Sequence, residues 1–342
     1  MFDIISIGSA TRDGFFKGIP FVEVEDKRFS VGRGIALPYG GKVKVPEVIF
    51  STGGGATNVS VTFSRQGFKT CCICRIGKDV SGEEIIRNLK AEKVNTKYFQ
   101  IDKNSPSAYS VIFLTESGER TILSYKGAGD DISEKEIPWK KLKSRWLFLS
   151  SLAGNKELLI ESINWAKKKK AFLATNPGFG ELKIFKEFPE LLNNFDIFIL
   201  NQEEAATLTD IPYNQEKELF KKLDNLIQGL VVMTKGPEGL IVSNGKELWR
   251  VGTYKEKAIV DRTGAGDAFA SGFVSAFLGN KRIIKKDGRC IFEDKNIEMA
   301  IRLGSANATS KVEKISAKAG LLRRGDINEE RWLELKVIKE IL

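Results

Sequence analysis

Short apolar runs alternate with amphipathic stretches along the chain after Lys126. Between the runs, apolar residues recur at helical spacing, as at 157–170 and 295–312, which indicates helices with one buried face. The runs themselves have the length of strands and stand at 146–151, 171–175, 196–200 and 230–234. Strands that alternate with helices form a mostly parallel sheet covered by helices on both faces, so the pattern predicts an α/β fold.

The N-terminal part of the chain follows a different pattern. A strand at 4–7 is followed, over 14–50, by short β-type runs that glycine-rich turns interrupt. Two further β-type runs, within 105–126, flank a polar turn at 116–119 and indicate a hairpin. We expect these two segments to form a small lid of antiparallel strands on a single α/β domain that spans 1–342.

Two glycine-rich turns lead into predicted helices. The first, at 53–55, precedes a helix that ends near Gly67, and the second lies in the stretch 258–279, which reads as strand, turn and helix. Glycine lets backbone amides converge on an anion, and the helix dipole adds about half a positive charge there. Each turn is therefore a candidate anion site, although close helix packing explains the first equally well.

The composition narrows the class of protein. Of the 342 residues, 42% are hydrophobic and 29% are charged, as in soluble globular proteins. No stretch approaches the ~18 apolar residues of a membrane span, and the N-terminus lacks the features of a secretion signal, so we expect a cytoplasmic protein with no membrane partner. The chain contains no histidine, which excludes histidine-based triads, metal ligands and general bases.

The formal charge of +10 raises the question of a nucleic-acid partner. The densest basic cluster, 167–170, closes a predicted helix, where the helix dipole favours cations. Basic and aromatic residues do not interleave elsewhere, and we expect no nucleic-acid partner. Cys71, Cys72 and Cys74 share one apolar run, and we interpret them as buried strand residues rather than metal ligands.

Asp267 directly follows the second glycine-rich turn. One interpretation is that it caps the helix; the other is that it accepts a proton from an alcohol that attacks a phosphate bound at the turn. No P-loop motif occurs, and the first turn fails as a dinucleotide fingerprint because Asn58 stands where glycine is required. A phosphate would therefore be held at the second turn, and the residues around Asp267 leave both interpretations open.

Several motifs together resemble the PfkB family of carbohydrate kinases, which includes ribokinase and adenosine kinase. The segment DRTGAGDAF at 261–269 is similar to the second family signature, and GGGATN at 53–58 is similar to the first. The remaining matches are Asn201 and Glu204 with an N-x-x-E motif, Thr234, Lys235, Gly236 and Gly239 with a segment that borders the nucleotide, and Asp13 with an acidic residue that binds substrate hydroxyls. The motifs follow the family order over nearly the whole chain, which implies a ribokinase-like fold.

The resemblance implies an ATP-dependent kinase that phosphorylates a primary hydroxyl of a sugar or a nucleoside. Asp267 would act as the base, and the amides of Gly264, Ala265 and Gly266 would hold the charge on the transferred phosphoryl group. The remaining roles fall to Asp13, Gly53, Gly54 and Asn58 for the substrate, to Asn201, Thr234, Lys235, Gly236, Gly239 and Asn307 for the nucleotide, and to Glu204 for Mg²⁺ through water.

The chain departs from the family pattern at two positions. Many family members bind a monovalent cation such as K⁺ near the positions that match Asp261 and Thr263, but here Arg262 stands between them, which counts against potassium activation. Ala174 stands where several hexose and sugar-acid kinases of the family have Asp. This difference favours a member of the ribokinase or nucleoside-kinase type.

Alternatives to this function remain open at this point. The same fold would suit a kinase of a sugar phosphate or a sugar acid, or a non-catalytic sensor of sugars or nucleosides. The apolar residues of the lid hairpin also favour a homodimer that forms through the lid.

Overall fold

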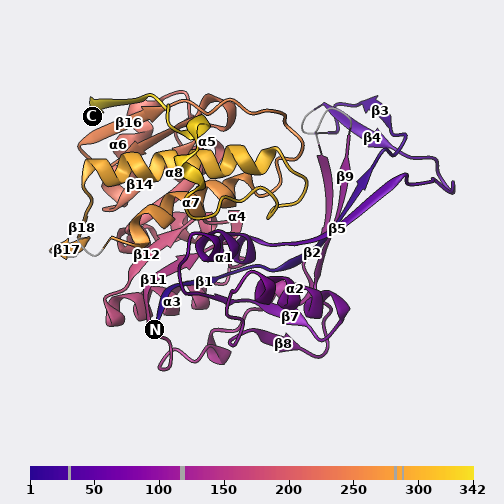
Figure 1. Cartoon of the computed structure of the whole chain (residues 1–342), viewed down its shortest axis with the longest axis horizontal. Helices are drawn as coiled ribbons and strands as arrows, with labels where there is room; N and C mark the ends of the chain where they lie inside the picture. The colour runs from indigo at the N-terminus through magenta and orange to yellow at the C-terminus, as the bar shows by residue number, and fades with distance from the viewer. Residues whose placement is uncertain (30–31, 116–119, 281–282, 287–288) are drawn as a thin grey trace.

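The computed structural model describes residues 1–29, 32–115, 120–280, 283–286 and 289–342. Within them, a main sheet has the strand order β19-β16-β15-β14-β13-β12-β11-β1-β6 (Figure 1). These strands are β1 (Phe2–Ile7), β6 (Thr70–Ile73), β11 (Ser144–Leu149), β12 (Phe172–Thr175), β13 (Ile197–Asn201), β14 (Leu230–Thr234), β15 (Leu240–Ser243), β16 (Glu247–Val251) and β19 (Val337–Ile341).

The strands of the main sheet from β6 to β14 pair in parallel, and β15, β16 and β19 add an antiparallel edge. Most positions of the parallel strands are buried, as expected for strands covered on both faces. The mostly parallel α/β sheet predicted from the alternating pattern is therefore confirmed. The strands β15 and β16 of this edge form an antiparallel pair.

Helices cover both faces of the main sheet. One apolar core lies under α3, α4, α5 and α6, and a second lies under α1, α7 and α8. The helices are α1 (Gly55–Arg65), α2 (Val80–Ala91), α3 (Lys156–Lys169), α4 (Phe179–Glu187), α5 (Gln202–Thr209), α6 (Glu216–Leu226), α7 (Ala265–Leu278) and α8 (Asp294–Val312). In the described part of the chain, no helix is long and apolar enough to cross a membrane.

A separate sheet projects from one side of the molecule (Figure 1). Its order is β10-β9-β2-β5, with β2 (Thr11–Lys17), β5 (Glu47–Gly53), β9 (Ala108–Leu114) and β10 (Arg120–Tyr125), and β3 (Val22–Glu25) pairs with β4 (Arg33–Ala36) beyond it. The predicted lid sheet is thus present, but β2 and β9 pair in parallel, because both strands lead outward and β5 and β10 return. The turn predicted at 116–119 lies outside the described residues.

Short strand pairs complete the described structure: β7 (Arg75–Gly77) with β8 (Gln100–Asp102), and β17 (Ile284–Lys286) with β18 (Arg289–Ile291). Cys71 and Cys72 lie on β6 and Cys74 follows it, all buried as predicted.

The strand predicted before the second glycine-rich turn is wrong. Residues 258–260 form no strand; instead the Val260 and Asp261 N–H groups both donate to the Val312 carbonyl oxygen at the end of α8, at 2.8 and 3.2 Å. The end of this β-branched run is therefore bonded to the end of a helix rather than to a sheet.

Candidate active site

The second glycine-rich turn forms the start of α7. Gly264 is the N-cap and adopts the left-handed conformation, with φ 76°, and a Cβ atom there would lie 2.7 Å from the Cβ atom of Ala317. Only glycine fits this position without strain. The Ala265 N–H donates to the Arg262 carbonyl oxygen at 3.2 Å, which leaves the amides of Gly266 and Asp267 as the helix-start donors that have no intrahelical partner.

The carboxylate of Asp267 lies on this first turn of α7. Its Oδ2 accepts a hydrogen bond of 2.8 Å from Nδ2 of Asn58, which lies on the first turn of α1. Burial raises the pKa of Asp267, and the hydrogen bond from Asn58 opposes that rise. The two glycine-rich helix starts, far apart in the sequence, therefore meet at one carboxylate, a contact that neither motif indicates by itself.

The first glycine-rich turn also contacts Asp13. A Cβ atom on Gly53 would lie 2.1 Å from Asp13 Oδ2, and one on Gly55 would lie 3.4 Å from Asp267 Oδ1. Gly54, with φ 95°, packs against the Ser9 carbonyl oxygen, so a side chain there would collide with backbone. Glycine at 53–55 therefore lets both carboxylates approach the same short segment.

Asp13 is buried on strand β2. Burial raises the pKa of Asp13, while a hydrogen bond from Ser110 and the charge of Lys318 oppose the rise. Lys318 was not anticipated: it is itself buried, burial lowers its pKa to about 8, and its Nζ donates to Thr52 Oγ1 at 2.7 Å.

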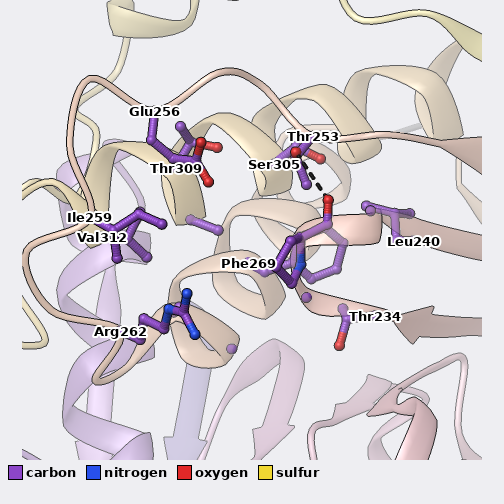
Figure 2. Close-up of a pocket in the computed structure, with 16 residues that line it drawn as sticks. Thr234, Leu240, Thr253, Glu256, Ile259, Arg262, Phe269, Ser305, Thr309 and Val312 are labelled. Atoms are coloured by element: carbon purple, nitrogen blue, oxygen red, sulfur yellow. Dashed lines mark hydrogen bonds between the residues drawn. The ribbon is translucent and has the colours of Figure 1, made fainter. Parts of the chain in front are cut away.

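A pocket of ≈ 260 Å³ borders the start of α7 (Figure 2). Phe269 lies at its centre in the view, with Ile259 and Val312 on one side and Leu240 on the other. The lining residues are Thr234, Gly236, Pro237, Gly239, Leu240, Thr253, Glu256, Ile259, Arg262, Ala265, Gly266, Phe269, Ser305, Ala308, Thr309 and Val312. An apolar pocket with a few polar groups suits a planar heterocycle and leads directly to the helix start.

The segment after β14 supplies one wall of this pocket. Of the residues expected to border the nucleotide, Thr234, Gly236 and Gly239 line it. Lys235 does not, because its Nζ is held by Glu216 at 2.7 Å and by Glu238 at 3.3 Å.

The Asn201–Glu204 pair forms the start of α5. Asn201 Oδ1 accepts the Glu204 N–H and Glu204 Oε2 accepts the Asn201 N–H, each at 2.8 Å. Asn201 also pairs with Thr234 in the sheet, which places this helix start next to the pocket wall. Burial raises the pKa of Glu204, whereas its hydrogen bond from Asn201 opposes the rise.

These groups fit a Mg²⁺ ion held through water. No cluster of three or more His, Cys, Asp or Glu side chains that could cage a metal occurs among the described residues. Mg²⁺ characteristically keeps several waters and uses one or two carboxylates together with substrate phosphates. Glu204 is a carboxylate of this kind, because its capping hydrogen bond uses Oε2 and leaves Oε1 to bind a water of the ion.

A monovalent cation near Asp261 and Thr263, against which Arg262 already counted, would meet a lysine of the same chain at Asp261. The Lys311 ammonium group is bonded to Asp261, at 2.5 Å from its main-chain oxygen and 3.2 Å from Oδ2, and both side chains are fully buried. The Thr263 and Ser316 N–H groups donate to the same carboxylate. Burial lowers the pKa of Lys311, and the neighbouring Asp261 opposes that shift.

Asn307 does not line the pocket. Its Nδ2 donates to Ala268 O at 2.7 Å and its Oδ1 accepts the Leu322 N–H, so the side chain joins α8 to α7 and to the C-terminal segment. Ser305, Ala308 and Thr309 of the same helix face the pocket instead. The helical spacing of these residues could have identified that face, since a position two residues from Ser305 points away from it.

The pattern of the pfkB family carbohydrate kinases matches residues 17–323. A ribokinase from Dictyostelium discoideum is 26% identical over 291 residues, which cover 79% of this chain and 87% of that protein.

Two solved structures share the fold. Ribokinase from Giardia lamblia aligns with a TM-score of 0.76 at 23% identity, over 95% of this chain and 97% of that one. The nucleoside kinase of Methanocaldococcus jannaschii aligns with a TM-score of 0.71 at 20% identity, over 96% and 98% of the two chains. The fold is thus ribokinase-like, and the chain belongs to the pfkB family of carbohydrate kinases.

Proposed function

We propose that this protein transfers the γ-phosphoryl group of ATP to a primary hydroxyl of a sugar or a nucleoside. The observation that carries the proposal is the position of Asp267. Its carboxylate lies on the helix start that borders the pocket, and through Asn58 and Gly55 it contacts the segment that also contacts Asp13. One carboxylate therefore lies between a site for a nucleotide and a site for a polyol.

In the proposed reaction, Asp13 accepts hydrogen bonds from substrate hydroxyls, and Gly53 and Gly54 let the substrate approach the backbone. Asn58 has a further role, because its Oδ1 is buried and has no hydrogen-bond partner among the described residues. A buried acceptor without a partner destabilises the folded state, because it has lost its hydrogen bonds to water. A substrate hydroxyl that donates to Oδ1 would supply the missing hydrogen bond.

Asp267 takes the proton of the attacking hydroxyl. Burial raises its pKa, which makes it a stronger base than an exposed aspartate, while the Asn58 hydrogen bond keeps the ionised form accessible. The amides of Gly266 and Asp267, which have no intrahelical partner, would hold the negative charge on the transferred group, assisted by the helix dipole; the Ala265 amide, expected to share this role, is bonded to the Arg262 carbonyl oxygen instead.

ATP would place its base in the pocket against Phe269 and Leu240, and its phosphates at the helix start past Thr234, Gly236 and Gly239. Mg²⁺, when bound through waters on Glu204, would neutralise phosphate charge. Asn201 orients that carboxylate through the capping hydrogen bonds.

The test is ATP-dependent release of ADP with a panel of sugars, nucleosides, sugar phosphates and sugar acids. We expect turnover with a sugar or a nucleoside, and a loss of kcat of about 10²–10⁴-fold in Asp267→Asn, the range typical of a general base. Thermal stabilisation by the substrate should persist in that variant. A protein that is stabilised by a ligand but never releases ADP would be a sensor, and equal kcat in both proteins would remove Asp267 from the base role.

A further inference from the structure

We infer that Lys311 is a built-in counterion for the anion-binding turn, and that this chain therefore needs no K⁺ or other monovalent cation for phosphoryl transfer. The inference rests on the proposed kinase function for its catalytic part and on the geometry of Asp261 for its binding part. It assigns Lys311 a positioning role, because the ammonium group acts through Asp261 and not on the substrate.

The side chain of Lys311 is fully buried, and its ammonium group donates to three oxygen acceptors. An ammonium has three N–H donors and no acceptor, and here the acceptors are Asp261 O at 2.5 Å, Asp261 Oδ2 at 3.2 Å and Lys314 O at 3.4 Å. Two of these are main-chain carbonyl oxygens and one is a carboxylate oxygen. This is the set of hard oxygen ligands that a bound metal cation would otherwise require.

Asp261 also accepts hydrogen bonds from two backbone N–H groups. Oδ1 accepts the Thr263 N–H at 2.8 Å, and Oδ2 accepts the Ser316 N–H at 3.0 Å. A cation that entered here would compete with Lys311 for the same oxygens and would be repelled by its charge. The charge of Arg120, on β10, also acts on Lys311, so a second positive group already lies nearby.

The position of Asp261 links this charge to the proposed chemistry. Asp261 begins the turn that runs to Gly264, and the Ala265 N–H closes that turn onto Arg262 O. By holding the main-chain oxygen of Asp261, Lys311 fixes the backbone from which the α7 amides project. Because the lysine is covalently part of α8, its charge is present at any salt composition.

The lysine also connects the turn to the lid. Ser316, whose N–H holds Asp261, donates or accepts through Oγ a hydrogen bond of 2.7 Å with Ser51 on β5. The lid strand, the C-terminal segment and the anion-binding turn thus form one connected set of contacts around a buried ion pair.

The first experiment measures cation binding independently of activity. Wild-type protein is unfolded thermally in KCl, NaCl and choline chloride at equal ionic strength. We expect the same melting temperature in all three salts. A saturable rise that is specific to K⁺ or Na⁺ would overturn the inference, whether or not the protein proves to be a kinase.

The second experiment measures phosphoryl transfer with choline salts of ATP, with and without added KCl. Wild-type kcat should not depend on K⁺. In Lys311→Met, kcat should fall by about 10²-fold with a smaller change in KM, as for loss of one preorganised electrostatic contact. Added KCl should restore part of that loss, because the oxygens of Asp261 become available.

A double variant covers the case in which Lys311→Met does not fold, since that change leaves a buried carboxylate unpaired. Asp261→Asn combined with Lys311→Met removes both charges and should fold. We expect it to have low kcat that KCl does not restore. Activation of the wild-type enzyme by KCl over choline chloride, or full activity of the double variant without any cation, would contradict the positioning role.

Discussion

Two opposing effects act on the carboxylate of Asp267. Burial raises its pKa, because the charged form loses hydration, and the Nδ2–H of Asn58 opposes the rise by donating to the ionised oxygen. Asp267 must be ionised to accept a proton, so activity should be lost as the pH falls through its raised pKa. The raised pKa also makes the free energy of unfolding depend on pH. The protonated form of Asp267 stabilises the folded state at low pH, and this contribution is lost as the pH rises through the raised pKa.

Asn58→Leu should raise the pKa of Asp267 further, because the hydrogen bond that lowers it is lost. The acid limb of the pH profile of kcat/KM should then move to higher pH. Steady-state kinetics from pH 5 to pH 9 measure this limb.

Thr57→Val is the matched control on the same turn of α1. It removes a structural hydrogen bond of 2.6 Å to Gly53 O but leaves the Asn58–Asp267 contact. We expect it to lower the melting temperature without moving the acid limb. An acid limb that stays in place in Asn58→Leu would show that Asn58 does not set the pKa of the base.

Two helix starts, those of α1 and α7, build the candidate site at the scale of elements. Both were predicted from glycine-rich turns, because the need for glycine is local and leaves a sequence signal. Their meeting through Asn58 and Asp267 depends on how α1 and α7 pack on one face of the sheet, and no local pattern carries that information. The prediction of a strand at 258–260 was wrong for the same reason, because the hydrogen bond of Val260 goes to the end of α8.

The two glycines at the start of α7 should respond differently to the same change. Gly264→Ala places a Cβ atom in a left-handed conformation and 2.7 Å from Ala317, so we expect it to lower the free energy of unfolding by ~1–3 kcal/mol. A Cβ atom on Gly266 meets no atom within 4 Å, and alanine favours a helix over glycine by about 1 kcal/mol, so Gly266→Ala should fold at least as well.

We expect Gly266→Ala to lose activity although it folds well. The methyl group of Gly266→Ala would stand where the transferred phosphoryl group is proposed to lie, so kcat/KM should fall by about 10-fold or more, the scale of one lost oxyanion contact. Chemical denaturation and steady-state kinetics together measure both effects. Full activity in Gly266→Ala would move the phosphoryl site away from this turn.

At the scale of the whole molecule, the sheet and its two helical layers position the site at the ends of the parallel strands, and the lid projects beside it (Figure 1). The alternating pattern was sufficient to predict the main sheet, because parallel strands that are buried on both faces consist of continuous apolar runs. The strand that carries Asp13, β2, was not predicted from the sequence, because a strand with glycine and charged residues has no clear alternation. Lys311 and Lys318 were missed since lysine on a helix or a loop normally lies in solvent.

The edge strand of the lid leads us to propose a homodimer. Leu123 and Tyr125 on β10 are 57% and 53% exposed, and no strand of the described residues pairs with the outer edge of β10. Light scattering should give twice the mass of one chain, and Leu123→Lys should give monomers. Met299→Lys, at a 45% exposed apolar position on α8, is the control that should remain dimeric. A monomeric wild-type protein at working concentration would end this proposal.

The central claim is that Asp267 promotes the transfer of a phosphoryl group from ATP to a substrate hydroxyl. The most direct measurement follows the γ-phosphoryl group of ATP by ³¹P NMR in the presence of the sugar or nucleoside that stabilises the protein most. We predict a phosphate ester that grows in step with ADP, and an Asp267→Asn rate that is lower by at least about 10²-fold. Inorganic phosphate without an ester, or an ester formed equally fast by both proteins, would contradict the account.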